Sequence, residues 1–422
     1  MKNIPKLRFP EFKDTEPWEQ RRLGEVGETK SGVGFPDDEQ GGNEGIPFYK
    51  VSDMNNIGNE YQMTSSNNYV TEAQISRRKW KVIDKVPAIM FAKVGAALLL
   101  NRKRLVNKPF LIDNNTMAYI PSSEWDINFC KVLFDTINLP KYSQVGALPS
   151  YNGSDIEAIK IPLPSLPEQE RIGSFFQTLD ATIASHQRKL EHLKMRKKGL
   201  LQKMFPKNGE SFPEIRFPEF TDAWEQRRLG EVADFSVKTN SLSREKLVIV
   251  EGDVKNIHYG DILVKYNNVL DYESSDIPFI AESEPGVKPE MFLQDGDIVF
   301  ADAAEDYSVG KCIELTNISG NIVSGLHTIV ARPRINFASY FMGYYLNSDI
   351  YRKQVLPMIQ GAKVSSISKR NLSITEISFP SLPEQERIGS FFQTLDATIA
   401  SHQRKLEHLK TLKKGLLQQL FP

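Results

Sequence analysis

The sequence predicts an α+β protein that is a pseudo-two-fold tandem repeat, in which two modules of mixed α/β structure are each followed by a long helix. A long segment that occurs twice predicts the helices, and a shorter motif before each module marks where each repeat begins. Short apolar runs separated by Gly, Asn and Asp predict the strands of the modules. We place the first module at 1–164, the first helix at 165–206, the linker and second module at 207–380, and the second helix at 381–422.

Two stretches of sequence repeat along the chain. An opening motif, Trp-Glu-Gln-Arg-Arg-Leu-Gly-Glu-Val, occupies 18–26 and 224–232, and the modules that follow it share little sequence. Identical frames around unlike inserts predict that the frame meets one partner twice and that the inserts meet two different targets. The segments 165–206 and 381–422 differ at only four of 42 positions, where Thr411 replaces Met195, Leu412 replaces Arg196, Gln419 replaces Lys203 and Leu420 replaces Met204.

The repeated segment has the pattern of a coiled-coil helix. Pro167 and Pro383 precede Glu-Gln-Glu, a sequence that suits a first helical turn. The backbone N–H that proline lacks would have no helical partner there, and acidic side chains interact favourably with the positive end of the helix dipole. Apolar residues then recur at steps of three and four, with Lys197 interrupting. A helix of about 55–60 Å is marginal alone, so the two seams are expected to pack on each other. Separate packing of each helix on its own module is the alternative. The predicted seam residues are Ile172, Phe176, Leu179, Ile183, Leu190, Leu193, Ile388, Phe392, Leu395, Ile399, Leu406 and Leu409.

Within the modules, short runs of β-branched and aromatic residues alternate with turn residues, which predicts mixed structure with irregular loops. We expect helices at 129–138 and 337–347. We expect strands at 46–51, 88–91, 117–120, 246–251, 261–265, 297–301 and 327–331.

Composition excludes several classes of protein. The chain is 40% hydrophobic and 25% charged, as ordinary globular proteins are, and its formal net charge is zero, so any polyanion must be bound by local basic patches. No apolar run reaches the roughly 18 residues of a membrane span, and the first residues lack the apolar stretch of a signal peptide. Cys130 and Cys312 are too far apart for a disulfide framework or a zinc cluster, which favours two core residues in a reducing cytoplasm.

Motifs for catalysis are missing. Residues 27–31 contain Lys-Ser but lack the glycine that precedes the lysine of a phosphate-binding loop. Histidines six residues apart on the repeated helices do not have the spacing of helical metal ligands. Asn107-Lys108-Pro109-Phe110 is similar to the Asn-Pro-Pro-Phe sequence of adenine methyltransferases but has a lysine in place of the first proline, and no glycine-rich cofactor turn precedes it. The sequence predicts binding rather than chemistry, with no catalytic or metal site.

With these motifs in order, the chain resembles the specificity (S, HsdS) subunits of bacterial type I restriction-modification systems over essentially its whole length. The resemblance rests on the opening motif, the proline-rich runs at 159–169 and 377–385, the duplicated helix, and the Gly-Asp-Ile-Val-Phe sequence at 296–300. It implies two target-recognition domains, each reading half of a split, asymmetric site on double-stranded DNA. The two long helices would form an antiparallel coiled coil that sets the spacing.

The resemblance also implies the partners. Two methyltransferase (M) subunits would dock on the repeated frame, and a motor-nuclease (R) subunit would join for cleavage. S-adenosylmethionine, ATP and Mg would be bound by these partners and none by this non-catalytic chain, which would act in the bacterial cytoplasm. A coiled-coil scaffold whose modules bind proteins is the alternative, and the neutral net charge is compatible with it.

Polar residues on the predicted loops are the candidates for reading bases and holding phosphates. Lys197-Lys198 and Lys413-Lys414 could face either the DNA spacer or an M subunit, and the sequence leaves both open. The candidate DNA-binding residues are Lys93, Arg102, Lys103, Arg104, Ser150, Tyr151, Asn152, Tyr266, Asn267, Lys363, Ser365, Ser366, Lys369 and Arg370.

Overall fold

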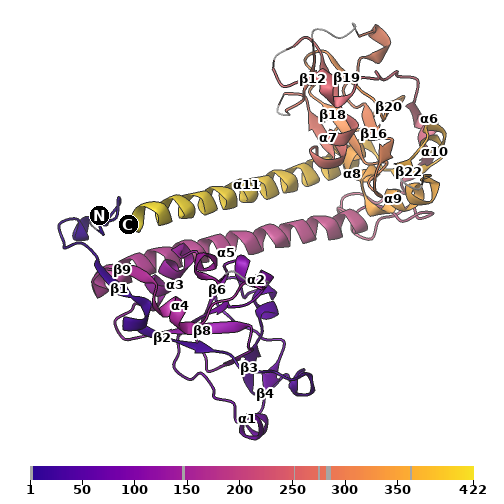
Figure 1. Cartoon of the computed structure of the whole chain (residues 1–422). Helices are drawn as coiled ribbons and strands as arrows, with labels where there is room; N and C mark the ends of the chain where they lie inside the picture. The colour runs from indigo at the N-terminus through magenta and orange to yellow at the C-terminus, as the bar shows by residue number, and fades with distance from the viewer. Residues whose placement is uncertain (1–2, 145–147, 251, 274–275, 282–286, 362–363) are drawn as a thin grey trace. The chain divides into compact units, whose positions relative to one another are not determined.

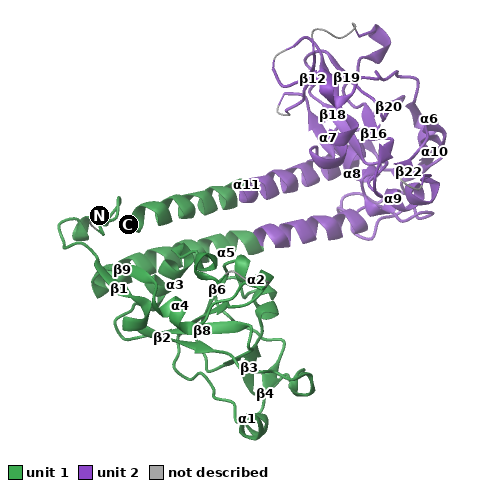
Figure 2. Ribbon diagram, viewed as in Figure 1, with its two compact units in different colours: residues 1–188, 404–422 green, residues 189–403 purple. Residues whose placement is uncertain are grey.

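The computed structural model describes residues 3–144, 148–250, 252–273, 276–281, 287–361 and 364–422 (Figure 1). The chain divides into two compact units (Figure 2). Unit 1 comprises Met1–Arg188 and Arg404–Pro422, and unit 2 comprises Lys189–Gln403. The repeated segments form two long helices, α5 (Leu166–Lys203) and α11 (Leu382–Leu420). Each unit therefore contains one module and part of both helices.

Unit 1 is organised around an antiparallel four-stranded sheet of order β2-β8-β5-β6. Its strands are β1 (Glu19–Arg22), β2 (Gly27–Ser31), β3 (Ile46–Tyr49), β4 (Tyr69–Val70), β5 (Ala88–Ala92), β6 (Lys103–Val106), β7 (Leu111–Ile112), β8 (Thr116–Pro121) and β9 (Lys160–Leu163), and its helices are α1 (Glu72–Arg78), α2 (Ala96–Leu99), α3 (Ile127–Thr136) and α4 (Gly153–Glu157). Every residue of β5 is buried, as the continuous apolar run predicts. A second sheet has the order β4-β3-β7, and β1 pairs antiparallel with β9.

Unit 2 has a five-stranded sheet of order β11-β20-β16-β18-β14, in which only β14 and β18 are parallel. Its strands are β10 (Glu225–Arg228), β11 (Ala233–Asp234), β12 (Leu247–Val248), β13 (Lys255–Ile257), β14 (Val269–Asp271), β15 (Phe279–Ile280), β16 (Ile298–Ala301), β17 (Ala303–Ala304), β18 (Cys312–Thr316), β19 (Ile322–Ser324), β20 (Thr328–Pro333), β21 (Ser365–Ser366) and β22 (Glu376–Phe379). Its shorter helices are α6 (Leu229–Val232), α7 (Tyr259–Val264), α8 (Phe341–Leu346), α9 (Asp349–Val355) and α10 (Lys369–Ser373). A second sheet has the order β12-β15-β13-β19, and β10 pairs with β22 as β1 does with β9.

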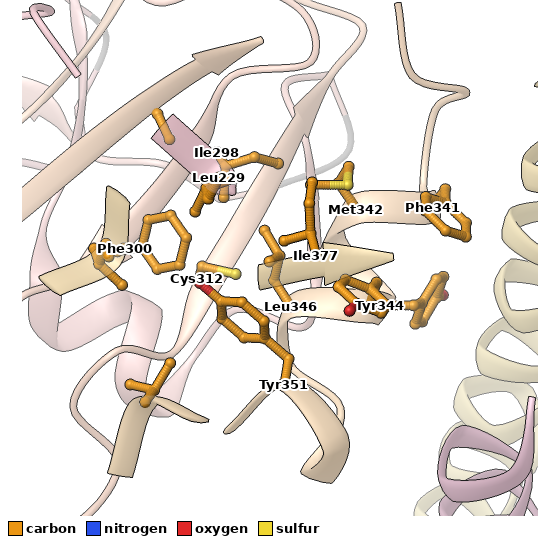
Figure 3. Close-up of a cluster of buried hydrophobic side chains, with 14 of the residues drawn as sticks. Leu229, Ile298, Phe300, Cys312, Phe341, Met342, Tyr344, Leu346, Tyr351 and Ile377 are labelled. Atoms are coloured by element: carbon orange, nitrogen blue, oxygen red, sulfur yellow. The ribbon is translucent and has the colours of Figure 1, made fainter. Parts of the chain in front are cut away.

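The principal core of each unit is completed by the end of the long helix from the other repeat. In unit 1, Phe421 follows α11 and packs against Trp18, Phe129 and Phe176, with ring centroids 5.6–6.4 Å apart. In unit 2, Phe205 follows α5 and packs against a cluster that includes Trp224, Phe341, Tyr345 and Phe392. Figure 3 shows side chains of this cluster, with Phe341 and Tyr344 toward the long helices.

The two helices run antiparallel where they meet inside each unit. In unit 1, Phe176 contacts Phe421 and Asp180 contacts Lys413. The residue numbers therefore increase along one helix as they decrease along the other. In unit 2, Lys197 faces Asp396 and Phe205 faces Phe392 in the same sense. The lysine that interrupts the predicted seam is therefore paired across the helices rather than turned to an outside partner.

Each residue of the predicted seam is at least partly buried. Leu179, Ile183, Leu193, Leu395 and Ile399 are half-buried. Ile172, Phe176, Leu190, Ile388, Phe392, Leu406 and Leu409 are buried.

Most predicted elements of the modules are present, and three differ. The strand expected at 261–265 is wrong, because Asp261–Val264 belong to helix α7, whose N-terminus is capped by the His258 side chain, and Lys265 is its C-cap. The apolar Ile262-Leu263-Val264 run suggested a strand, but Val264 is 86% exposed. Only Leu247–Val248 of the expected 246–251 strand pairs in a sheet, and Glu251 lies outside the described residues. The helix expected at 337–347 begins later, at Phe341, because Tyr340 has a left-handed φ of 75°.

No helix in the described parts of the chain is long and apolar enough to cross a membrane. Among the same residues, no group of three or more His, Cys, Asp or Glu side chains is arranged to hold a metal ion.

Candidate nucleic-acid interface

In unit 1 a loop and a turn that are distant in sequence meet at one end of the main sheet. Phe91 pairs with Lys103 at the ends of β5 and β6, so the connecting loop leaves the sheet there. Val94 in this loop forms an antiparallel bridge with Ser150, which lies in the turn before α4. We name residues 93–102 together with 148–152 the unit 1 platform.

The unit 1 platform contains Lys93, Arg102, Ser150 and Asn152 of the predicted readers. Lys93 is half-buried, and no partner for its ammonium is found among the described residues. Its backbone is fixed on both sides, because its N–H donates to Asn115 O at 2.9 Å and its carbonyl accepts from Tyr151 N at 3.3 Å. Asn152 is exposed but caps α4 by accepting from Asp155 N at 3.1 Å. The platform therefore offers one unpaired cation on a rigid backbone.

Three predicted readers are not exposed, which corrects the sequence analysis. Tyr151 is 4% exposed, and its hydroxyl donates a hydrogen bond to the carbonyl of Ala92. This buried hydrogen bond ties the turn before α4 to the end of β5. Lys103 is 2% exposed, and its ammonium donates to Asn101 Oδ1 at 2.8 Å and to Ile137 O at 2.7 Å. Burial lowers the pKa of Lys103 to about 8. Tyr266 is 6% exposed in the core of unit 2.

Arg102 and Arg104 are half-buried and already engaged. The Arg102 guanidinium donates to Asn55 Oδ1, and the Arg104 guanidinium donates to the carbonyls of Lys103 and Met54. Burial lowers the pKa of Arg104.

Unit 2 has an equivalent platform, which we define as residues 302–311 with 364–368. Here the loop joins β16 to β18, and its residues Ala303 and Ala304 pair antiparallel with Ser366 and Ser365. Ser366 stands at the same distance before its long helix as Ser150 does in unit 1. The two modules therefore build the same joint between loop and turn from unlike sequences.

The remaining predicted readers of unit 2 lie around this platform. Ser366, Lys369, Arg370 and Asn267 are exposed, and Ser365 is half-buried. Lys369 is engaged through its ammonium, which donates to Phe235 O at 3.1 Å. Lys363 lies outside the described residues.

The sequence analysis missed functional candidates in the unit 2 platform and beside it. His327 Nδ1 lies 3.3 Å from Asp302 Oδ1, and burial raises the pKa of Asp302. A pocket of about 500 Å³ opens beside this pair and is lined by Tyr259, Ala303, Glu305, Ser308, His327 and Val364 among others. The signal was available for the loop residues, because 302–308 follow the predicted strand at 297–301 much as Lys93 follows the predicted strand at 88–91. The left-handed His327, with φ of 58°, had no such signal.

Away from the platforms, the repeated frame builds the same contacts twice. Arg8 forms a bidentate ion pair with buried Glu168 at the start of α5, with both N–O distances at 2.7 Å. Arg216 forms the same pair with Glu384 at the start of α11, again with two distances of 2.7 Å. In unit 1 this pair borders a pocket of about 570 Å³ between the opening motif and the helix start.

Comparisons with known proteins agree on one family. A family model described as "Type I restriction modification DNA specificity domain" matches residues 15–195 and 221–411. The type I restriction enzyme MjaIX specificity subunit of Methanocaldococcus jannaschii is 21% identical over 97% of this chain and 95% of that one. The MjaVIII specificity subunit of the same organism is 24% identical over 65% of this chain, and the match spans only 64% of that relative. The EcoKI specificity subunit of Escherichia coli K12 is 24% identical over 38% of this chain and 34% of its own.

Solved structures share the fold. The S subunit of a type I restriction-modification system from M. genitalium superposes with a TM-score of 0.59 at 16% identity, covering 99% of both chains. A chain from a study of complex assembly in a type I R-M system gives a TM-score of 0.51 at 19% identity, covering 96% of this chain and 97% of that one. With two family matches that together span most of its length, the chain belongs to the type I restriction-modification DNA specificity family.

Proposed function

We propose that each module reads one half of a bipartite, asymmetric site on double-stranded DNA. The observation that carries this proposal is the pair of platforms, which share one backbone joint but differ in side chains. The unit 1 platform offers the unpaired Lys93, whereas the unit 2 platform carries the exposed acidic residues Glu305 and Asp306. Lysine holds phosphates, and a carboxylate accepts a hydrogen bond from the amino group of cytosine in the major groove. Two platforms of opposite character therefore suit two different half-sites.

The readers we assign are those that remain accessible. In unit 1 these are Lys93, Arg102, Ser150 and Asn152. In unit 2 they are Asn267, Ser365, Ser366, Lys369 and Arg370, with Glu305 and His327 added from the structure. Arg104 is half-buried and better placed to support the loop than to reach a base.

The long helices are assigned the role of spacer, as an antiparallel coiled coil that fixes the gap between half-sites. The antiparallel contacts inside each unit support this assignment, and so does the burial of the seam residues in both helices. An insertion of four residues lengthens a helix by about 6 Å, close to two base pairs of B-DNA.

The partners we propose are two copies of one methyltransferase subunit, joined for cleavage by a motor-nuclease subunit. The repeated frame supports the two-fold partner, because its surface features occur twice. Leu166 and Leu382 begin α5 and α11 and are each 42% exposed, and each stands two residues before the glutamate of a buried Arg–Glu pair. S-adenosylmethionine, ATP and Mg²⁺ belong to these partners in the proposal.

Methylation mapping tests the proposal directly. Cells that carry this chain and its methyltransferase partner are expected to show one split methylated motif. Replacing residues 26–163 by the corresponding module of another specificity subunit should change one half-site and leave the other unchanged. A change in both halves, or in neither, would contradict independent reading.

The protein-binding scaffold remains the competing function and is separated by an electrophoretic mobility shift. The purified complex with methyltransferase subunits should retard a duplex carrying the mapped motif in excess of unrelated duplex. Equal retardation of both duplexes would favour the scaffold.

A further inference from the structure

At the helix crossing in each unit, one lysine of one helix is paired with one aspartate of the other. In unit 1, Lys413 Nζ lies 2.6 Å from Asp180 Oδ1. In unit 2, Lys197 Nζ lies 2.6 Å from Asp396 Oδ1 and 2.8 Å from Oδ2. These four residues occupy the same two positions of the repeated segment, so each helix contributes one lysine and one aspartate.

Both pairs are largely shielded from solvent. The side-chain exposures are 21% and 14% for Lys413 and Asp180, and 20% and 22% for Lys197 and Asp396. Separating a shielded pair leaves charges with neither water nor a partner, so displacement along the helix axis is opposed more strongly than by the apolar seam alone. Apolar contacts are non-directional and tolerate a shift, whereas a polar pair within a seam specifies one register.

In unit 2 a tyrosine from the recognition module contacts the pair. In unit 2, the Tyr344 hydroxyl of α8 donates to Asp396 Oδ2 at 2.8 Å, and Lys197 Nζ lies 5.3 Å from the Tyr344 ring centroid. In unit 1, the buried hydroxyl of Tyr61 and the second oxygen of Asp180 are both without a hydrogen-bond partner among the described residues. Burial raises the pKa of Tyr61, and the negative charge of Asp180 raises it further.

We propose that Lys197–Asp396, together with Tyr344, and Lys413–Asp180, which we name the register clusters, select the helix register inside each unit and thereby the length of the gap between DNA half-sites. They are positioning residues and contact no base. This inference rests on the proposed spacer role of the helices. It adds that two paired charges, rather than helix length alone, choose one gap over its neighbours.

A charge exchange at constant composition tests the clusters in the full chain with its methyltransferase partner. Lys197→Asp with Asp180→Lys changes only α5 and places like charges opposite each other in both units. Adding Lys413→Asp and Asp396→Lys restores opposite charges in both. We expect the α5 exchange to raise the fraction of methylated sites whose gap differs by one base pair about tenfold, with both half-sites unchanged. The complete exchange should return the fraction to the native level.

A milder set covers the case in which the α5 exchange fails to fold. Lys197→Gln with Lys413→Gln removes both pairs without repulsion, and Lys189→Gln with Lys405→Gln changes exposed lysines at equivalent positions elsewhere on the same two helices. The register clusters are supported if methylated sites with more than one gap length appear in the first variant, while the second variant methylates only sites with the native gap. A single native gap at native methylation in the first variant and in the α5 exchange overturns them.

A four-residue insertion in α5 distinguishes this inference from the proposed spacer role. If the insertion shifts the gap while the charge variants keep it sharp, the helices set the spacing and only the register clusters fail. If the insertion leaves the gap unchanged, the spacer role itself fails.

Discussion

Units 1 and 2 are alike throughout the repeated sequence, whereas outside it they share the joint between loop and turn but differ in other parts of their modules. The buried Arg–Glu pairs at the helix starts have the same geometry in both units, and β1–β9 and β10–β22 pair in the same sense. The second sheets of the two units differ in strand order. Their buried carboxylates differ in their hydrogen-bond partners. Glu39 in unit 1 accepts hydrogen bonds from the side chains of Arg77 and Arg78, whereas Glu314 in unit 2 accepts backbone hydrogen bonds from Tyr340 and Gly343. The repeated frame can thus carry modules whose interiors are stabilised in different ways.

The aromatic residue after each long helix should have the largest effect on stability. Phe205→Ala is expected to lower the free energy of unfolding by about 4 kcal/mol and Phe421→Ala by about 3 kcal/mol, since truncating a buried phenylalanine leaves a cavity. Phe205 is 1% exposed and Phe421 is 8% exposed, which sets the order. Denaturant unfolding measures both values. Leu412→Ala, at a residue 43% exposed, is the control and should change little. A loss below about 1 kcal/mol for both phenylalanines would show that the helix ends are dispensable to the cores.

The buried ion pairs of the frame should respond equally in the two units. Arg8→Met and Arg216→Met each leave a glutamate only 1% exposed without its cation, and each should cost about 3 kcal/mol. Arg171→Met removes the exposed pair with Glu11 and should lower the free energy of unfolding far less than either of these changes. Unequal losses for Arg8 and Arg216 would break the equivalence of the two frames.

The pH dependence of stability should have opposite signs in the two units. Burial raises the pKa of Glu314 from 4.5 to about 7, so its contribution is full below pH 4.5 and is lost as pH rises through 7. Arg77, Arg78 and Gln74 lower the pKa of Glu39 from 4.5 to about 2, so its contribution is full above pH 4.5 and is lost as pH falls toward 2. For Glu314 the slope is at most about 1.4 kcal/mol per pH unit.

Hydrogen exchange, corrected for the intrinsic rate at each pH, resolves the two units in one experiment. Between pH 5 and 7, roughly the interval between the two Glu314 values, protection of unit 2 should decrease with rising pH while unit 1 shows no matching loss. Glu314→Gln should flatten the response of unit 2. Parallel slopes in both units would refute the contrast between the two carboxylates.

The smallest expected effect concerns the lysines near the platforms. Lys93→Ala removes an unpaired cation, so the plot of log affinity for the cognate duplex against log salt should become shallower by about 0.9. Lys369 is already bonded to Phe235 O, so Lys369→Ala should change the slope less. Lys160→Ala, at an exposed residue of β9, is the control. Binding titrations over a range of salt concentrations give the three slopes, and equal slopes would mean that Lys93 touches no phosphate.

The long helices could be predicted from sequence because their signal is local. The prolines at 167 and 383 and the apolar steps placed them at 165–206 and 381–422, and the structure has Leu166–Lys203 and Leu382–Leu420. The buried strand at 88–91 was equally predictable, because a continuous apolar run bounded by turn residues has few other uses.

Contacts between distant residues could not be predicted from local patterns. Tyr151, Lys103 and Tyr266 were chosen as readers because polar residues near turns are usually exposed, but each finds a carbonyl partner inside its unit. Helix α7 was mistaken for a strand because Ile262 and its apolar neighbours fit both periods over so short a run. The sequence showed that Lys197 interrupts the seam, but its ion pair with Asp396 of the other helix is visible only in the folded structure.

The division of unit 1 between two stretches of chain has a consequence for biosynthesis. Residues 1–188 leave the ribosome first, yet Phe421, which fills their core, is made only after all of unit 2. Unit 2 is a continuous stretch of chain, and Phe205 precedes its module. All residues of its core are therefore available once residue 403 has left the ribosome. Domains usually fold in the order of synthesis. In this protein the second module can reach its native state before the first, whose aromatic core is incomplete until Phe421, the residue after α11, has been added.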